Sequence, residues 1–387
     1  MGLFSSNTKE NTLLIDISSS SVACALVHNK KGVEPEIDFA IRESFQNIES
    51  DQSENVEVRM LLVLRKILNT TFTKGQEILK QKNRKGGVDV VIVGLSSLWY
   101  ISSLKTKEVS DKEGVLLTTG AQRDILRSEQ ISFLEELKDV YKEESEIFES
   151  NIIGVSANGY RIENWTNKTA TAFDITFLQA GAPKKLIRAL ENEVIKTFGT
   201  KRGISVHSIN SVLSQLISHS YKNLHSAVLV DISGDTTNIL FIHDSVPKKV
   251  VLIPFGINSL VNKISENLTL PKAIAESMMS LYLKGDLKEE SAKELDGVFL
   301  DAREEWDFNS IISKENSIYH SPQNIFLVSD TKYGEIGKTM LEDIFLDKEV
   351  IILDCKQGFI KECIRSDKEN YLDGHLAILG TYSQFLY

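Results

Sequence analysis

The chain has few cysteines, no excess of positive charge and no long apolar segment, and each shortage excludes a class of protein. Three cysteines in 387 residues are too few, and odd in number, for a disulfide framework. Acidic residues (54) outnumber basic ones (44), and a net charge of −10 argues against nucleic acid as the main partner. No apolar run reaches the roughly 18 residues that a membrane span needs, and the start does not resemble a signal peptide. We therefore expect a cytoplasmic protein.

The motifs of common catalytic sites are missing as well. The sequence has no Gly-x-Ser-x-Gly elbow, no Walker lysine motif, and no His, Cys and carboxylate cluster with the spacing of a metal site. What remains, with 42% hydrophobic and 25% charged residues, is typical of a soluble globular protein. The length is sufficient for two or more domains with cores of their own.

One pattern occurs twice: an apolar run, an aspartate, a small polar turn and a second apolar run. One copy spans 227–244 and contains Asp231 and Ser233. The other, at 13–28, superimposes on it without a gap, so that Asp16 matches Asp231. Each copy predicts a β-hairpin. A repeat separated by half the chain predicts two related domains that face each other and offer two hairpins to one ligand.

The chemistry of such a turn suits a phosphate. Successive backbone N–H groups and hydroxyls of a turn can line up on one anion. The aspartates that precede the two turns, Asp16 and Asp231, could hold a hydrated Mg²⁺ beside it. The repeat therefore predicts a phosphate site between the two halves of the chain.

Hydrophobic periodicity predicts the remaining elements. Helices are expected at 56–82, 183–198, 211–221, from 260 onward, at 271–283, from 335 onward and at 372–385; strands are expected at 37–42, 88–95, 203–209, 250–253, 324–328 and 350–353. The basic segment 82–87 is expected to be a solvated loop, Cys24 a small core residue and Trp306 an anchor to the core. Residues 103–180 differ in composition from the segments on either side of them. An acidic helix is expected at 122–150 and strands on both sides of Asn158-Gly159, so this segment is predicted to be a separate α+β insert.

These elements, together with the turn Pro254-Phe255-Gly256-Ile257-Asn258, resemble the actin-like ATPase superfamily. Gly159-Tyr160-Arg161-Ile162-Glu163 within the insert resembles the FtsA and PilM branch, and the opening Met1-Gly2-Leu3-Phe4 is more similar to the PilM group. The resemblance implies an α/β, actin-like (ribonuclease H-like, duplicated) two-domain fold with a small inserted α+β subdomain of the 1C or SHS2 type. Domain I would comprise 1–102, 181–226 and a closing helix at 371–387, the insert 103–180, and domain II 227–370.

The same resemblance implies ATP and Mg²⁺ as ligands. Carried over by position, the nucleotide-binding residues would be Asp16, Ser18, Ser19, Ser20 and Ser21 of the first hairpin, Asp231, Ser233, Gly234, Asp235, Thr236 and Thr237 of the second, and Gly256, Asn258, Glu276 and Ser329 beyond them, with Asp16 and Asp231 as metal ligands.

Several positions depart from the superfamily pattern. Ser18 and Ser233 stand where glycine lets the backbone approach a phosphate. Met279 stands where a basic residue is expected, and Ser329-Asp330 replaces glycines after a strand. Asn210 and Gln215, near the expected position of a water-orienting residue, are not convincing bases. We therefore expect ATP binding with weak or absent hydrolysis, and we assign no catalytic residue.

The resemblance leaves three functions open. A PilM-like scaffold would bind the cytoplasmic tail of a bitopic, PilN-like membrane protein at the inner face of the membrane and could assemble into filaments. An FtsA-like cell-division adaptor would bind the tail of FtsZ, but the membrane anchor that it needs is not found in this sequence. A small-molecule kinase of the same fold would need an acidic base and a sugar pocket, and neither is recognisable.

Overall fold

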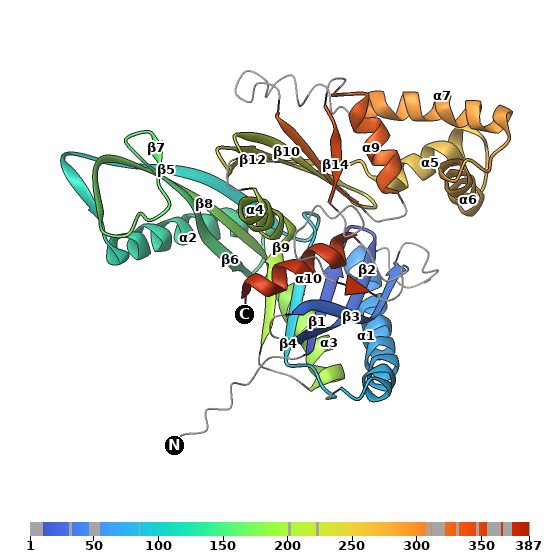
Figure 1. Ribbon diagram of the computed structural model, residues 1–387, viewed down its shortest axis with the longest axis horizontal. Coiled ribbons are helices and arrows are strands. Elements are labelled where there is room, and N and C mark those ends of the chain that lie inside the picture. The colour runs from blue at the N-terminus through green and yellow to red at the C-terminus, as the bar shows by residue number, and fades with distance from the viewer. Residues whose placement is uncertain are drawn as a thin grey trace.

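The computed structural model describes residues 11–30, 33–45, 55–84, 86–199, 203–221, 224–306, 311, 322–329, 333–345, 348–353, 365–366 and 374–386. These residues form two large sheets with helices on their faces, and a third sheet that projects to one side (Figure 1). The α/β, two-domain architecture expected from the repeat is confirmed.

The first sheet has the order β15-β3-β2-β1-β4-β9 and contains the first repeat. Its strands are β1 (Asn11–Ile17), β2 (Ser21–Lys30), β3 (Val33–Ser44), β4 (Val90–Leu95), β9 (Ile204–Ser208) and β15 (Arg365–Ser366). β1 and β4 are buried along their whole length, as expected for central strands that are covered on both faces.

The second sheet, β12-β11-β10-β13-β14, repeats the order of the first. Its strands are β10 (Ser226–Ile232), β11 (Thr237–His243), β12 (Val246–Ile253), β13 (Asn324–Ser329) and β14 (Val350–Ile352). The two hairpins also share one register, since Asp16 lies opposite Ala23 and Asp231 lies opposite Asn238 at the matching position. β1 pairs in parallel with β4, and β10 with β13. The internal repeat is therefore a repeat of structure.

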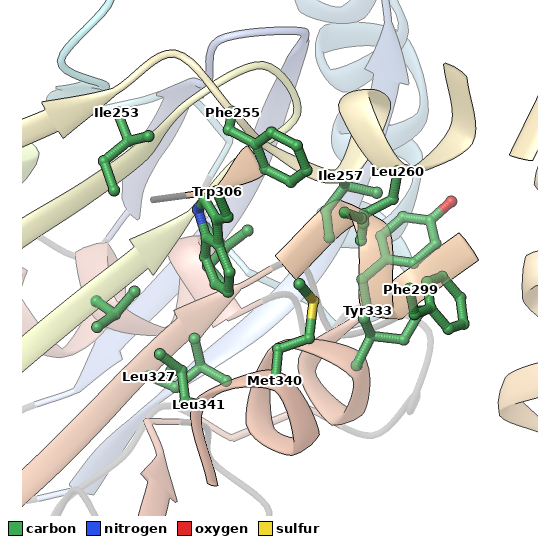
Figure 2. Packing of buried hydrophobic residues seen from close by; sticks show 14 of the residues in the cluster. Ile253, Phe255, Ile257, Leu260, Phe299, Trp306, Leu327, Tyr333, Met340 and Leu341 are labelled. Atoms are coloured by element: carbon green, nitrogen blue, oxygen red, sulfur yellow. The ribbon is translucent and has the colours of Figure 1, made fainter. Parts of the chain in front are cut away.

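Helices cover the outer faces of both sheets. α1 (Val56–Gln81) and α3 (Lys184–Phe198) pack on the first sheet and are joined by Arg65, whose Nε donates to Glu193 Oε2 at 2.8 Å. On the second sheet lie α5 (Ile257–Asn267), α6 (Lys272–Leu283), α7 (Glu289–Glu305) and α9 (Gly334–Glu342), and Trp306 is the anchor of this core, as predicted (Figure 2). None of the helices in the described ranges is long and apolar enough to cross a bilayer.

Two helices lie between the sheets. α4 (Ile209–Ser220) and α10 (Gly374–Leu386) share one buried cluster with residues of both sheets (Figure 1). Leu213 and Leu379 belong to it, together with Ile92 from the first sheet and Phe326 from the second. The predicted closing helix therefore connects the two halves of the molecule through its packing.

The insert is a four-stranded sheet of order β5-β8-β6-β7 with one helix. Its elements are β5 (Ile101–Leu117), α2 (Thr119–Tyr141), β6 (Ser145–Ala157), β7 (Tyr160–Arg161) and β8 (Lys168–Pro183). The acidic helix expected at 122–150 is too long: α2 ends at Lys142, which has a left-handed φ of 56°, and 145–150 belongs to β6. The charged segment 105–114 lies within β5, an edge strand, where charged side chains can face water.

The insert contacts both sheets. Glu149 of β6 accepts hydrogen bonds from the backbone N (3.1 Å) and Oγ of Ser208 at the start of α4. A Cβ added to Gly154 of β6 would lie 2.8 Å from the side chain of Val246 in β12. Arg161 donates to the backbone carbonyl of Asp244 in the turn between β11 and β12 of the second sheet. The insert is therefore attached to both halves of the molecule.

The basic turn after α1 is not a freely solvated loop. Lys82 Nζ lies 2.8 Å from Asp38 Oδ1, and Arg84 contacts both Asp38 and Glu36 of β3. Asp38 is buried, so these cations compensate its charge. Cys24 is a core residue as predicted, and burial raises the pKa of its thiol.

Candidate functional site

The turns of the two hairpins touch each other. The backbone N–H of Asp235 donates to Ser19 Oγ at 2.8 Å, which joins the second turn to the first. Gly234 lies so close to Ser20 that a Cβ on Gly234 would overlap Oγ and Cβ of that serine. Each turn is also closed on itself: Ser18 N donates to Ser21 O, and Ser233 N to Thr236 O, both at 2.9 Å. The sequence repeat correctly indicated that the two turns come together.

Gly256 and Asn258 approach the second turn, as the resemblance implied. Asn258 donates from its backbone N to Gly234 O (2.7 Å) and from Nδ2 to Asp235 Oδ1 (2.9 Å). A Cβ on Gly256 would lie 2.5 Å from the carbonyl oxygens of Ser233 and Gly234. Glycine at 256 is therefore required for the close approach of two backbones, rather than for a special φ angle.

The carboxylate of the first hairpin is paired with a cation of the protein. Asp16 Oδ2 accepts a hydrogen bond from Arg42 Nη2 at 2.7 Å, and Arg42 Nη1 donates to Ser21 Oγ at 2.7 Å. The side chain of Asp16 is only 3% exposed and that of Arg42 only 15%. A charge-assisted bond between such buried groups is strong, and the carboxylate depends on it because water cannot replace it.

The carboxylate of the second hairpin has a different partner. His375, in the first turn of α10, donates from Nε2 to Asp231 Oδ1 at 2.8 Å, and both side chains are buried. Burial alone would lower the pKa of His375, but the charges of Asp231 and Asp16 outweigh it and raise the pKa to about 9. The two carboxylates therefore favour the charged form of His375.

Three other predicted ligands belong to strands or helices rather than to the two turns. Thr237 faces the core of the second half, where Oγ1 donates to the carbonyl of Phe255 at 2.7 Å. Glu276 of α6 accepts from the hydroxyl of Tyr333 at 3.2 Å, just before α9. Ser329 ends β13, and Asp330 lies outside the described residues. Among the residues that the structure describes, Ser329 Oγ and His375 Nδ1 are buried without a hydrogen-bond partner.

The departures from the superfamily pattern have local reasons. Met279 is fully buried in the core of the second half, where a basic side chain would be costly. Asn210 is buried and accepts a hydrogen bond from Asn238. Gln215 donates to Ser211 Oγ (3.0 Å) and Tyr382 OH (3.3 Å). The Gln215 amide nitrogen and the Asn210 amide oxygen are therefore engaged within the protein, whereas Asn210 Nδ2 is buried without a partner, and an amide is not a base.

A phosphate and a magnesium ion fit this site to different degrees. The orphaned Oγ of Ser329 and the glycine at 256 suit a polar ligand near the turns, but a phosphate between them would first have to separate Ser19 from Asp235. The magnesium ion does not fit, because both carboxylates that would hold it are already paired with Arg42 and His375. No group of three or more candidate metal ligands exists in the described part of the chain.

Arg42 and His375 were not foreseen from the sequence. For Arg42 a signal exists: β3 follows the first hairpin and pairs with β2, so a basic residue in it can lie beside Asp16. His375 lies 144 residues from Asp231, and no local pattern connects them.

Replacing Gly234 with alanine is expected to push the two turns apart. The added methyl would overlap Ser20, and overpacking of this kind costs about 1–3 kcal/mol of unfolding free energy. Chemical denaturation of the G234A variant measures this loss. The second-site change Ser20→Gly should restore most of it, because the methyl would then occupy the vacated space. If G234A is as stable as the native protein, the turns do not meet as described.

Comparison with known proteins supports the fold. No protein-family model matches this sequence, and no curated protein matches it either. Among solved structures, the PilM-PilN type IV pilus biogenesis complex matches with a TM-score of 0.63 and 12% identity, over 98% of this chain and 99% of that chain.

Two further solved structures match less well. A Bacteroides thetaiotaomicron protein with an actin-like ATPase fold has a TM-score of 0.46 and 11% identity, over 97% of this chain and 96% of that one. The ethanolamine utilization protein EutJ from Carboxydothermus hydrogenoformans has a TM-score of 0.44 and 11% identity, over 88% of this chain and 84% of that one. In its fold the chain is thus similar to a chain of the PilM-PilN complex, in agreement with the actin-like two-domain fold expected from the sequence.

Proposed function

We propose that this chain is an actin-like scaffold that binds the cytoplasmic tail of a single-span, PilN-like membrane protein. The observation that carries the proposal is the likeness to the PilM-PilN complex, which extends over nearly the whole of both chains at a TM-score of 0.63. A match of this extent includes the insert as well as both large sheets. The protein would then act at the inner face of the membrane through its partner.

We also propose that ATP binds at the two turns and is hydrolysed slowly or not at all. The repeated hairpins and the orphaned hydroxyl of Ser329 support a nucleotide. Phosphoryl transfer depends on positioned groups, and Asn210 and Gln215 are bonded elsewhere. Binding requires the Ser19–Asp235 hydrogen bond to break, so that nucleotide opens the contact between the two halves.

The tail-binding proposal predicts a direct interaction with a peptide. The test uses fluorescein-labelled tail peptides of the single-span membrane proteins encoded beside this chain, with fluorescence anisotropy as the readout. We expect saturable binding of one native tail and none of its scrambled sequence. A tail peptide of FtsZ is the competing probe, and binding of that peptide alone would support the cell-division role instead.

We place the tail site on the insert, whose helix α2 presents exposed apolar side chains, and surface variants test this placement. Ile131 and Val140 on α2 of the insert are 54% and 62% exposed, and Leu300 on α7 of domain II is 56% exposed. Because all three side chains are exposed, aspartate at each should leave the fold intact. We expect Ile131→Asp or Val140→Asp to weaken tail binding at least about tenfold, or 1.4 kcal/mol, and Leu300→Asp to leave it unchanged. Equal loss in all three variants would contradict a site on the insert.

A further inference from the structure

Two buried carboxylates, each paired with a basic side chain, lie at the turns of the two hairpins. Asp16 and Arg42 form one ion pair, and Asp231 and His375 form the other. We propose that Arg42 and His375 take the place of a divalent cation at these carboxylates, so that the site binds its anionic ligand without a metal ion. The inference deepens the proposed function and rests on the nucleotide binding proposed above.

The sequence places Arg42 beside Asp16 through the strand register. Asp16 lies opposite Ala23, and Ala23 lies opposite Arg42, so the three residues stand side by side across β1, β2 and β3. Residues directly opposite on neighbouring strands point to the same face. The small side chain of Ala23 leaves space above β2, and the guanidinium of Arg42 crosses it to reach the carboxylate.

The second hairpin obtains its cation by another route. The corresponding row in domain II is Asp231, Asn238 and Leu252, which contains no cation. His375 comes instead from α10, between the two sheets, and donates from above the end of β10. Each carboxylate is thus paired with its own basic side chain, and the two basic side chains come from unrelated elements. Two separate pairings at equivalent positions are harder to attribute to chance than a single pairing on the surface.

A divalent cation would have to compete with these groups. Both carboxylates already accept hydrogen bonds from basic side chains of the protein, Asp16 from Arg42 and Asp231 from His375. The nearby carboxylate of Asp235 is also engaged, because its Oδ1 accepts from Asn258 Nδ2 at 2.9 Å. An ion bound to Asp16 would lie near the guanidinium, which is 2.7 Å from the same carboxylate, and repulsion between buried like charges is large. Mg²⁺ also retains several waters, which need space that the buried side chains of Asp231 and His375 fill. Even a neutral His375 would still donate to Asp231 from Nε2.

Direct metal binding is the first test. The full-length chain is freed of metal with EDTA, dialysed and titrated with Mn²⁺, and free Mn²⁺ is followed by electron paramagnetic resonance. We expect no stoichiometric binding to the native protein. The Arg42→Met variant uncovers Asp16 and should gain a Mn²⁺ site, whereas Arg65→Met, which removes an arginine from an ion pair on the outer helices, should not. Stoichiometric Mn²⁺ binding by the native chain would overturn the inference.

Nucleotide binding is the second test. ATP affinity is measured by isothermal titration in EDTA and in excess Mg²⁺. We expect the two dissociation constants to differ by less than about tenfold, or 1.4 kcal/mol. A native protein that binds ATP only with Mg²⁺ overturns the inference but leaves the proposed nucleotide binding intact. A protein that binds no ATP in either condition refutes that binding, and the Mn²⁺ titration of the native chain still decides whether the carboxylates accept a metal. The Mn²⁺ titration of the native chain does not depend on the variant, so it remains a valid test even if Arg42→Met does not fold.

Discussion

The Arg42→Met variant is expected to lose about 3–5 kcal/mol of unfolding free energy, because it removes the guanidinium that is paired with the buried carboxylate of Asp16. Asp16 is 3% exposed and lies in the central strand β1, so neither water nor a movement of the chain can easily replace the guanidinium. The loss of the hydrogen bond to Ser21 Oγ adds to the effect. Urea unfolding followed by circular dichroism measures the change, with the slope of the transition as a check on cooperativity.

A double variant separates the charge from the packing. In Arg42→Met with Asp16→Asn, the buried charge is absent, and a neutral pair of similar volume should recover most of the lost stability. Arg65→Met provides the matched comparison. Its partner Glu193 is 8% exposed but retains a second cation, Lys196 Nζ at 3.0 Å, and the Arg65 side chain is 55% exposed, so Arg65→Met should cost no more than about 1 kcal/mol. If Arg42→Met and Arg65→Met have the same small effect, the Asp16 pair is not buried in solution.

The features that were predictable from the sequence are those that repeat or have a local period. The two hairpins could be aligned because Asp16 and Asp231 sit at the same place in gapless apolar patterns, and the structure gives them the same register. The helices α1 and α3 follow a clear helical spacing. In contrast, the end of α2 depended on Lys142, whose left-handed backbone conformation has no distinctive signal in an acidic stretch that otherwise favours helix.

The chemistry of the site was harder to foresee because it depends on distant partners. Asp16 and Asp231 lie near the ends of the strands that lead into the two turns, and the resemblance implied a metal ion there, where the structure has Arg42 and His375. Ser19 and Asp235 are 216 residues apart in the sequence, and their contact depends on how the two halves of the molecule face each other. Motif residues alone do not reveal the basic partners of the carboxylates or the contact between the turns, because both depend on how distant elements pack.

Thr237 shows how a motif position can acquire a structural role. The resemblance implied that it binds nucleotide, yet Oγ1 donates to Phe255 O at 2.7 Å and accepts from Trp306 Nε1 at 3.1 Å. Trp306 is 1% exposed and packs between Phe255 and the helices of domain II (Figure 2). The indole therefore links the core around the second sheet to Thr237, the residue directly after the second turn. Removing the indole should therefore destabilise the second turn as well as the core.

Replacing Trp306 with alanine is expected to lower the unfolding free energy by about 3–5 kcal/mol, since it removes the largest fully buried side chain of the described residues and leaves a cavity. Trp306→Phe keeps most of the packing and removes the hydrogen bond to Thr237, so it should cost about 1–3 kcal/mol for the unsatisfied group and the lost atoms. Urea unfolding of both variants measures the two changes in unfolding free energy.

The control for this prediction is Trp165 in the insert, which is partly buried and packs against a smaller core. Trp165→Ala should cost less than half as much as Trp306→Ala, because less surface returns to water and less cavity is left. Thr237→Val provides the second comparison: it keeps the shape of the side chain and removes the hydroxyl, so with Trp306→Phe it should be less than additive. Fully additive losses would show that the indole and the hydroxyl do not act together, and Thr237 would then be free to serve a ligand.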